Sequence, residues 1–238
     1  MTHIDYHAVL ETLREHREVC PLCAFTRAAE TQYFNSMLYS WVGTEGFQDR
    51  FLANDGFCTT HAHRLGSRND GVAIAMLYAP LLAHRRRWLH RVSRSRIMQL
   101  LRRATLRRDR APAARGERAD PRACPLCDQV ARWEIQFLRN LARHGNDTDL
   151  RTVYSEGSGL CLPHYRLLVH RVRRVPAWLE EHQEARMDAL AEALDAYTRG
   201  ASGGTGGRDS TVWRELLEFM EGTPGAVRCA EPHGRLRG

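Results

Sequence analysis

Hydrophobic residues recur at helical spacing along most of this chain. Five apolar residues spaced four apart, from Phe25 to Trp41, mark one face of a helix over residues 24–42. No segment alternates polar and apolar residues as a half-buried strand does. The pattern therefore predicts an all-α fold. Similar apolar stripes predict further helices at residues 5–18, 58–65, 70–101, 128–144, 176–197 and 210–222. Residues 43–54 are expected to form a connection.

The same order of elements occurs twice. Each half has a cysteine knuckle, a helix, a short helix carrying further ligands, and a long helix, so we expect two tandem repeats followed by a C-terminal helix. The expected organisation is an N-terminal helix and first metal-binding repeat at 1–101, an Arg-rich linker at 102–121, a second metal-binding repeat at 122–199, a Gly-rich linker at 200–209, the C-terminal helix at 210–222 and a tail at 223–238.

Each repeat carries the same cysteine and histidine motif. A CPLC pair is followed, after 34 residues in one repeat and 33 in the other, by a C-x-x-H pair that a glycine precedes by two positions. Residues three apart share a helix face or a tight turn and can reach one ion together. Three thiolates and one imidazole form the ligand set of a closed zinc site. The sequence predicts one site per repeat: Cys20, Cys23, Cys58 and His61 in the first, and Cys124, Cys127, Cys161 and His164 in the second.

The donor set favours two zinc ions in structural sites, because the protein fills all four positions and leaves none for a reactive water. Iron–sulfur clusters are the alternative, since three cysteines and one histidine can also hold iron. Covalent haem is disfavoured because Ala24 and Asp128, not histidine, follow the CPLC pairs.

Cysteine usage and the lack of export signals favour the cytoplasm. Six of the seven cysteines lie in the two motifs, and an odd count argues against a disulfide scaffold. The N-terminus lacks the layout of a secretory signal, and no apolar run reaches the length of a membrane span. We therefore expect a cytoplasmic protein that does not bind a membrane.

The chain is basic, with a net charge of +7. All 35 basic residues are arginine, which is typical of a GC-rich genome. The positive charge is therefore weaker evidence for phosphate binding than it would otherwise be. The segment 85–118 nevertheless holds thirteen arginines against two acidic residues. Nucleic-acid binding through this segment is a second alternative, although no base-reading module accompanies it.

Two carboxylates recur at matching positions. Glu30 and Glu134 each lie seven residues after the last cysteine of a CPLC pair, about 10 Å along a helix and too far to ligate the same ion. They are candidates for outer-sphere or active-site carboxylates, or for salt-bridged surface residues. The sequence identifies no catalytic residue and leaves open whether the protein is an enzyme.

These residues together resemble a known family. The CPLC pair, the helix with Glu30 and Tyr33, the GFC-x-x-H motif and the segment DGVAI at 70–74 are similar to the bacterial domain of unknown function 6062 family. The resemblance is close over 19–82, good over 124–165 and loose around Trp213. It implies a two-repeat, helical, cysteine-rich bacterial protein, and it implies no activity.

The leading hypothesis is a metal-binding helical scaffold with a binding or regulatory role. The alternative is an iron–sulfur redox protein or enzyme that uses the same ligands. The partner is left open between another protein, a second copy of the chain and nucleic acid.

Overall fold

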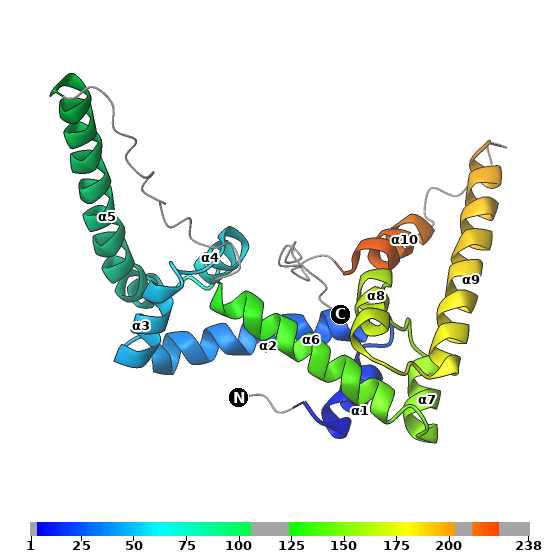
Figure 1. Cartoon of the computed structure of the whole chain (residues 1–238). Helices are drawn as coiled ribbons and strands as arrows, with labels where there is room; N and C mark the ends of the chain where they lie inside the picture. The colour runs from blue at the N-terminus through cyan, green and yellow to red at the C-terminus, as the bar shows by residue number, and fades with distance from the viewer. Residues whose placement is uncertain (1–3, 106–123, 203–210, 224–238) are drawn as a thin grey trace. The chain divides into compact units, whose positions relative to one another are not determined.

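The computed structural model describes residues 4–105, 124–202 and 211–223, with the side chains of 91–105 and 200–202 left out. Every regular element within these ranges is a helix (Figure 1). The all-α prediction is confirmed. Most of the expected Arg-rich linker, Gly-rich linker and tail falls at 106–123, 203–210 and 224–238, outside the described residues.

The helices follow the same order after each CPLC pair. A long helix begins at the pair, a short helix follows, then a short helix that carries the C-x-x-H histidine, then another long helix. Helix α1 (Tyr6–Glu15) precedes the first CPLC pair. The helices that follow this pair are α2 (Pro21–Ser36), the π-helix η1 (Met37–Trp41), α3 (Glu45–Ala53), α4 (Thr59–Gly66) and α5 (Gly71–Thr105). The second set is α6 (Pro125–Arg143), α7 (Thr148–Ser155), α8 (Leu162–Arg171), α9 (Ala177–Ser202) and α10 (Val212–Glu221).

A helix forms where the sequence pattern predicted a connection, over residues 43–54. This helix, α3, buries Phe47 and Phe51, which are four residues apart and so share one face. The ring of Phe51 meets that of Tyr78 on α5 edge-on, with 5.3 Å between centroids. The prediction was wrong here because two aromatic residues in a nine-residue segment give too short a pattern, whereas burial against α5 stabilises the helix.

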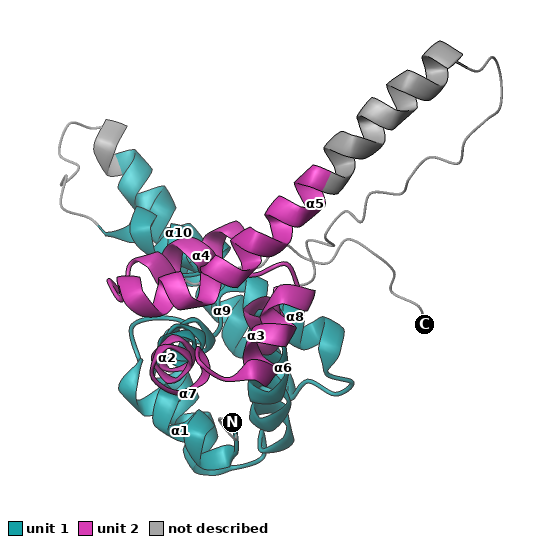
Figure 2. Ribbon diagram, turned by 90° about the vertical axis from the view of Figure 1, so that its left-hand side faces the viewer, with its two compact units in different colours: residues 1–31, 130–230 teal, residues 32–129, 231–238 magenta. Residues whose placement is uncertain are grey.

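The chain forms two compact units (Figure 2). Unit 1 comprises residues 1–31 and 130–230, and unit 2 comprises 32–129 and 231–238. Helices α2 and α6 each begin in one unit and end in the other, because the boundaries fall inside them.

Each unit has its own apolar core. In unit 1, α1 packs against α7, and α10 packs against α8 and α9. In unit 2, α5 packs against α3 and α4. Fully buried side chains include Leu22, Phe137, Leu138, Leu141, Leu150 and Tyr154 in unit 1, and Phe34, Met37, Phe51, Leu65, Leu77 and Leu126 in unit 2. None of the described helices is long and apolar enough to cross a membrane.

Candidate metal centres

Both CPLC pairs lie at the start of a long helix. Cys20 immediately precedes α2 and Cys23 lies in its first turn, where the Ala24 N–H donates to the Cys20 carbonyl at 3.1 Å. Pro21 takes the first helical position, which suits proline because that residue needs no N–H partner. Cys124 and Cys127 occupy the same places at the start of α6. The positive end of the helix dipole thus lies close to each thiol pair and favours thiolates there.

Both C-x-x-H pairs open a short helix. Cys58 is the N-cap residue of α4 and Cys161 that of α8, and the histidine follows one turn later. The preceding glycines, Gly56 and Gly159, have φ angles of 87° and 63°. A side chain at Gly159 would also bring its Cβ to 2.9 Å from a His182 ring nitrogen. The motif therefore needs glycine at this position for both its backbone conformation and its packing.

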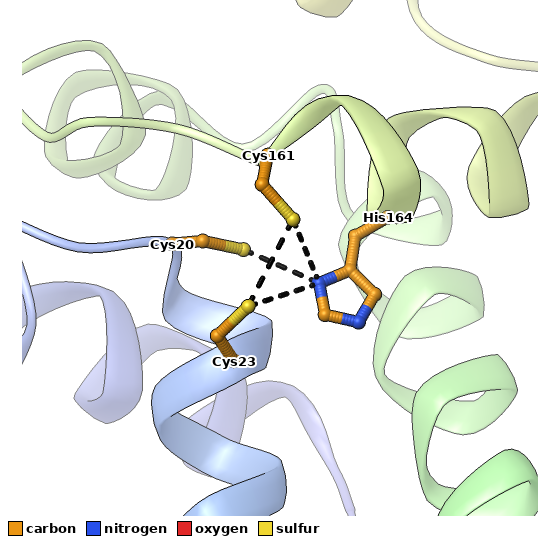
Figure 3. Close-up of side chains that lie close together, drawn as sticks. All are labelled: Cys20, Cys23, Cys161 and His164. Carbon is orange, nitrogen blue, oxygen red and sulfur yellow. Dashed lines mark hydrogen bonds between the residues drawn. The ribbon is translucent and has the colours of Figure 1, made fainter. Parts of the chain in front are cut away.

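The first cluster lies in unit 1 and consists of Cys20, Cys23, Cys161 and His164 (Figure 3). The Nδ1 atom of His164 lies 3.4 Å from Cys20 Sγ, 3.5 Å from Cys23 Sγ and 3.2 Å from Cys161 Sγ. The Sγ atoms of Cys23 and Cys161 are 3.8 Å apart. All four side chains are buried, so the cluster is closed to solvent.

The second cluster lies in unit 2 and consists of Cys58, His61, Cys124 and Cys127. The Nδ1 atom of His61 lies 3.3 Å from Cys58 Sγ and 3.4 Å from the Sγ atoms of Cys124 and Cys127. Cys58 and Cys127 Sγ are 3.6 Å apart. His61 and Cys124 are buried, and Cys58 and Cys127 are partly exposed.

The structure brings together all eight predicted residues, but it pairs them differently from the sequence prediction. Each cluster combines the CPLC pair of one repeat with the C-x-x-H pair of the other. The prediction of one complete ligand set per repeat is therefore wrong. The physical reason is that a continuous helix cannot fold back on itself. Helix α2 leads the chain from unit 1 into unit 2. The next pair, Cys58 and His61, therefore meets the second CPLC pair, which lies at the start of α6.

The donor atoms are spaced as ligands of a single ion. Zinc–sulfur bonds of about 2.3 Å and zinc–nitrogen bonds of about 2.0 Å in a tetrahedron imply separations of roughly 3.8 Å between sulfurs and roughly 3.5 Å between sulfur and nitrogen. Two of the sulfur pairs, one in each cluster, lie 3.8 and 3.6 Å apart, the sulfur–nitrogen separations are 3.2 to 3.5 Å, and all donor atoms of a cluster lie within 4.8 Å of one another. A disulfide would require about 2.0 Å between sulfurs. Both clusters therefore fit a tetrahedral metal ion.

The thiols of each cluster affect one another's ionisation. Burial raises the pKa of Cys20 well above its usual value, and hydrogen bonding to Cys161 lowers that of Cys23. In the second cluster, the hydrogen bond with Cys127 and burial raise the pKa of Cys124 to about 11. Three adjacent buried thiolates are costly without a positive charge among them. A bound cation would supply that charge.

His164 has a carboxylate behind it. Its Nε2 atom donates to Glu134 Oε1 at 3.3 Å, while Nδ1 faces the sulfurs. Burial disfavours the charged imidazole, but the contacts with Cys20, Cys23 and Glu134 outweigh it, and the pKa of His164 is raised well above its usual value. A carboxylate in this place orients a ligating histidine and fixes its tautomer. Glu134 thus supports the cluster of unit 1, although Cys127, seven residues earlier, belongs to the other cluster.

A family model described as a family of unknown function, DUF6062, matches residues 2–196. The chain belongs to this family. The resemblance inferred from the motifs is thereby confirmed, and the matched region includes all eight cluster residues. Among curated proteins and among solved structures, none matches the chain.

One residue beside the unit 1 cluster lies outside the DUF6062 match and was missed by the sequence analysis. Gly222 ends α10 with a φ of 87°, and a Cβ there would lie 3.3 Å from Cys23 Sγ and 3.7 Å from Cys161 Sγ. The end of α10 therefore covers this cluster. A lone glycine after a helix is an ordinary helix end in sequence terms, so nothing local signalled this contact.

Proposed function

We propose that each cluster binds one zinc ion, and that the two ions staple a helical scaffold whose role is binding or regulation. The observation that carries this proposal is the closeness of the donors: in each cluster all four ligand atoms lie within 4.8 Å of one another. Such a set can surround one ion with no further ligand. A site closed in this way is structural and does not activate water.

The donor chemistry supports zinc over harder ions. Thiolate and imidazole are the ligands of structural zinc sites, whereas magnesium and calcium take oxygen ligands. The separations also favour one ion over an iron–sulfur cluster, which places its protein ligands on different irons held apart by bridging sulfides. Reduced thiols at these positions fit the cytoplasmic location expected from the sequence.

The ligands of each cluster join parts of the chain that no continuous helix connects. In unit 1 the ion would link the start of α2 to the start of α8, and in unit 2 the start of α4 to the start of α6. Metal binding would then contribute directly to the free energy of folding, because the ligand set does not exist in the unfolded chain. Nucleic-acid binding stays a prediction from sequence, since its arginines lie largely outside the described side chains.

Metal analysis of protein purified anaerobically tests the proposal. We expect a colourless protein with about two zinc ions per chain, and no acid-labile sulfide. The variants His61→Ala and His164→Ala should each lose one ion. Their matched controls are His63→Ala and His170→Ala, which change exposed histidines on the same helices and should keep both ions.

A brown protein that contains iron and sulfide would reject zinc in favour of iron–sulfur clusters. Retention of both ions by His61→Ala or His164→Ala would show that these histidines are not ligands. Protein that carries no metal and keeps its thermal stability in the presence of a chelator would reject a metal-stapled scaffold altogether.

A further inference from the structure

A cavity of about 280 Å³ lies in unit 2, next to the second cluster but not part of it. Pro125, which stands between the ligands Cys124 and Cys127, forms part of its wall. The volume falls near the lower end of the range for small-molecule sites. An apolar cavity of about 150 Å³ already holds one benzene ring, so this one has room for a larger molecule.

Four of the eight residues that line the cavity are aromatic. Tyr33 and Trp41 meet edge-on with 5.3 Å between centroids, and Trp41 lies 6.0 Å from Phe47. Phe47 and Phe51 are stacked at 6.3 Å. Four rings thus follow one another around the cavity. Such a wall favours a planar ring, which can pack edge-on or offset against several of them.

A π-helical turn brings two of these rings to the same face. Residues eight apart in a regular α-helix are offset by about 80°. Tyr33 and Trp41 are eight apart, but η1 intervenes, and the Val42 N–H donates to the Met37 carbonyl at 2.9 Å across five residues. The wider turn rotates Trp41 back toward Tyr33. Single π turns of this kind occur frequently at functional sites.

Arg50 is the charged residue among the eight that line the cavity. It is exposed, and its guanidinium makes no ion pair or hydrogen bond with any side chain in the described part of the protein. No carboxylate is among the lining residues. An anionic group on a ligand would find its counter-charge here, and a planar carboxylate matches the fork of a guanidinium. A cation would meet the same charge unfavourably.

We infer that this cavity binds a small planar aromatic carboxylate, with its ring among Tyr33, Trp41 and Phe47 and its carboxylate on Arg50. The inference does not depend on which metal the neighbouring cluster binds. It gives the scaffold a ligand class, which the metal clusters alone do not.

A series of probes that share a naphthalene ring and carry an anionic, a neutral or a cationic substituent tests the inference. The probes are 2-naphthoate, the neutral 2-naphthylmethanol and the cationic 2-naphthylmethyl-trimethylammonium, titrated into the full-length protein as purified and followed by calorimetry and ligand-observed NMR. We expect saturable binding of 2-naphthoate, binding of the alcohol about fivefold weaker, and no binding of the cation.

Variants locate the site. Arg50→Gln should weaken 2-naphthoate about fivefold and leave the alcohol unchanged. The control Arg86→Gln changes an exposed arginine on α5 and should affect neither probe. Trp41→Ala should weaken both probes, with circular dichroism and metal content used to check that the variant is folded.

The inference is overturned if 2-naphthoate does not saturate, if the cation binds as tightly as the anion, or if Arg50→Gln binds all three probes as the parent protein does. Preference for the cation would instead indicate an aromatic cage for quaternary ammonium groups. Arg50 is exposed, so Arg50→Gln should leave the protein folded. Weaker binding by this variant would therefore reflect loss of the binding site and not unfolding.

Discussion

The Nδ1 atom of His164 lies 3.4 Å from the Sγ atom of Cys20, although 144 positions separate them in the chain. Cys20 begins the motif of the first repeat, and His164 ends that of the second. The reciprocal contact joins His61 Nδ1 to Cys124 Sγ, also at 3.4 Å. Each cluster thus combines residues from both copies of the motif, and neither cluster consists of residues from one copy alone.

Pairs of serine substitutions distinguish exchanged clusters from clusters within repeats. Cys58→Ser combined with Cys124→Ser removes two ligands of the same cluster, so we expect this protein to keep one metal ion per chain. Cys58→Ser combined with Cys20→Ser damages both clusters and should leave none tightly bound. Metal analysis after dialysis against a weak chelator reads out the difference. The reverse pattern would mean that each repeat binds its own ion.

Glu134→Gln tests the carboxylate behind His164. Glutamine keeps the shape but removes the negative charge that the imidazole N–H meets at 3.3 Å. Loss of such a partner lowers metal affinity by about tenfold or more. Competition with a coloured chelator should show one weakened ion and one unchanged ion. Glu180→Gln, on the exposed side of α9, serves as the control. Equal affinity in Glu134→Gln and the parent would show that the contact does not tune the cluster.

Gly222→Ala tests the contact of α10 with the unit 1 cluster. The backbone of Gly222, with φ 87° and ψ 167°, lies in a region that is essentially confined to glycine, so an alanine there costs about 1–3 kcal/mol, and its Cβ would crowd Cys23 Sγ. We expect a lower melting temperature and faster release of one metal ion. Gly66→Ala is the matched control, because no atom lies within 4 Å of the added Cβ there. If the two variants behave alike, the end of α10 does not cover the cluster.

The pair of Tyr6 and Asp147 predicts a pH dependence in unit 1. The Tyr6 hydroxyl donates to Asp147 Oδ1 at 2.9 Å, and Asp147 also caps α7. Burial and the hydrogen bond to Asp147 raise the pKa of Tyr6 above its usual value. Because the pKa of Tyr6 is higher in the folded protein than in the unfolded chain, where it is about 10, this group stabilises the fold at every pH below 10. The stabilisation is lost as the pH rises through the pKa that Tyr6 has in the folded protein.

Tyr6→Phe should therefore melt below the parent protein near pH 8, and the difference should shrink as the pH rises above 10. Thermal unfolding at several alkaline pH values checks this, with both proteins metal-loaded. Tyr39→Phe, the same change at a highly exposed tyrosine, is the control. A difference that does not vary with pH would mean that the tyrosine acts through packing alone.

The sequence singled out the eight clustered residues because the information that marks them is local. Cys20 and Cys23 are three residues apart, as are Cys58 and His61, and each pair can reach one ion in the isolated segment. Which pairs meet depends on where α2 and α6 lead the chain, and periodicity does not encode that. The residues that come together were therefore predictable from the sequence, whereas their pairing was not.

Packing also decides features that propensity leaves undetermined. Residues 45–53 become helical because Phe47 and Phe51 are buried in unit 2. The π turn before Val42 depends equally on its surroundings, since an i→i+5 bond has poor intrinsic stability and no simple sequence pattern. Long amphipathic helices such as α9 were predicted because a stripe repeated over many turns is a strong signal.

The exchange of ligands has a consequence for biosynthesis. All four ligands of the unit 2 cluster lie between Cys58 and Cys127, so this unit can close as soon as that stretch has left the ribosome. Cys23, in contrast, must wait for Cys161, 138 residues later, which takes on the order of ten seconds at cellular rates of synthesis. The nascent chain would load its metals in a fixed order, and the thiols made first would be the last to be protected.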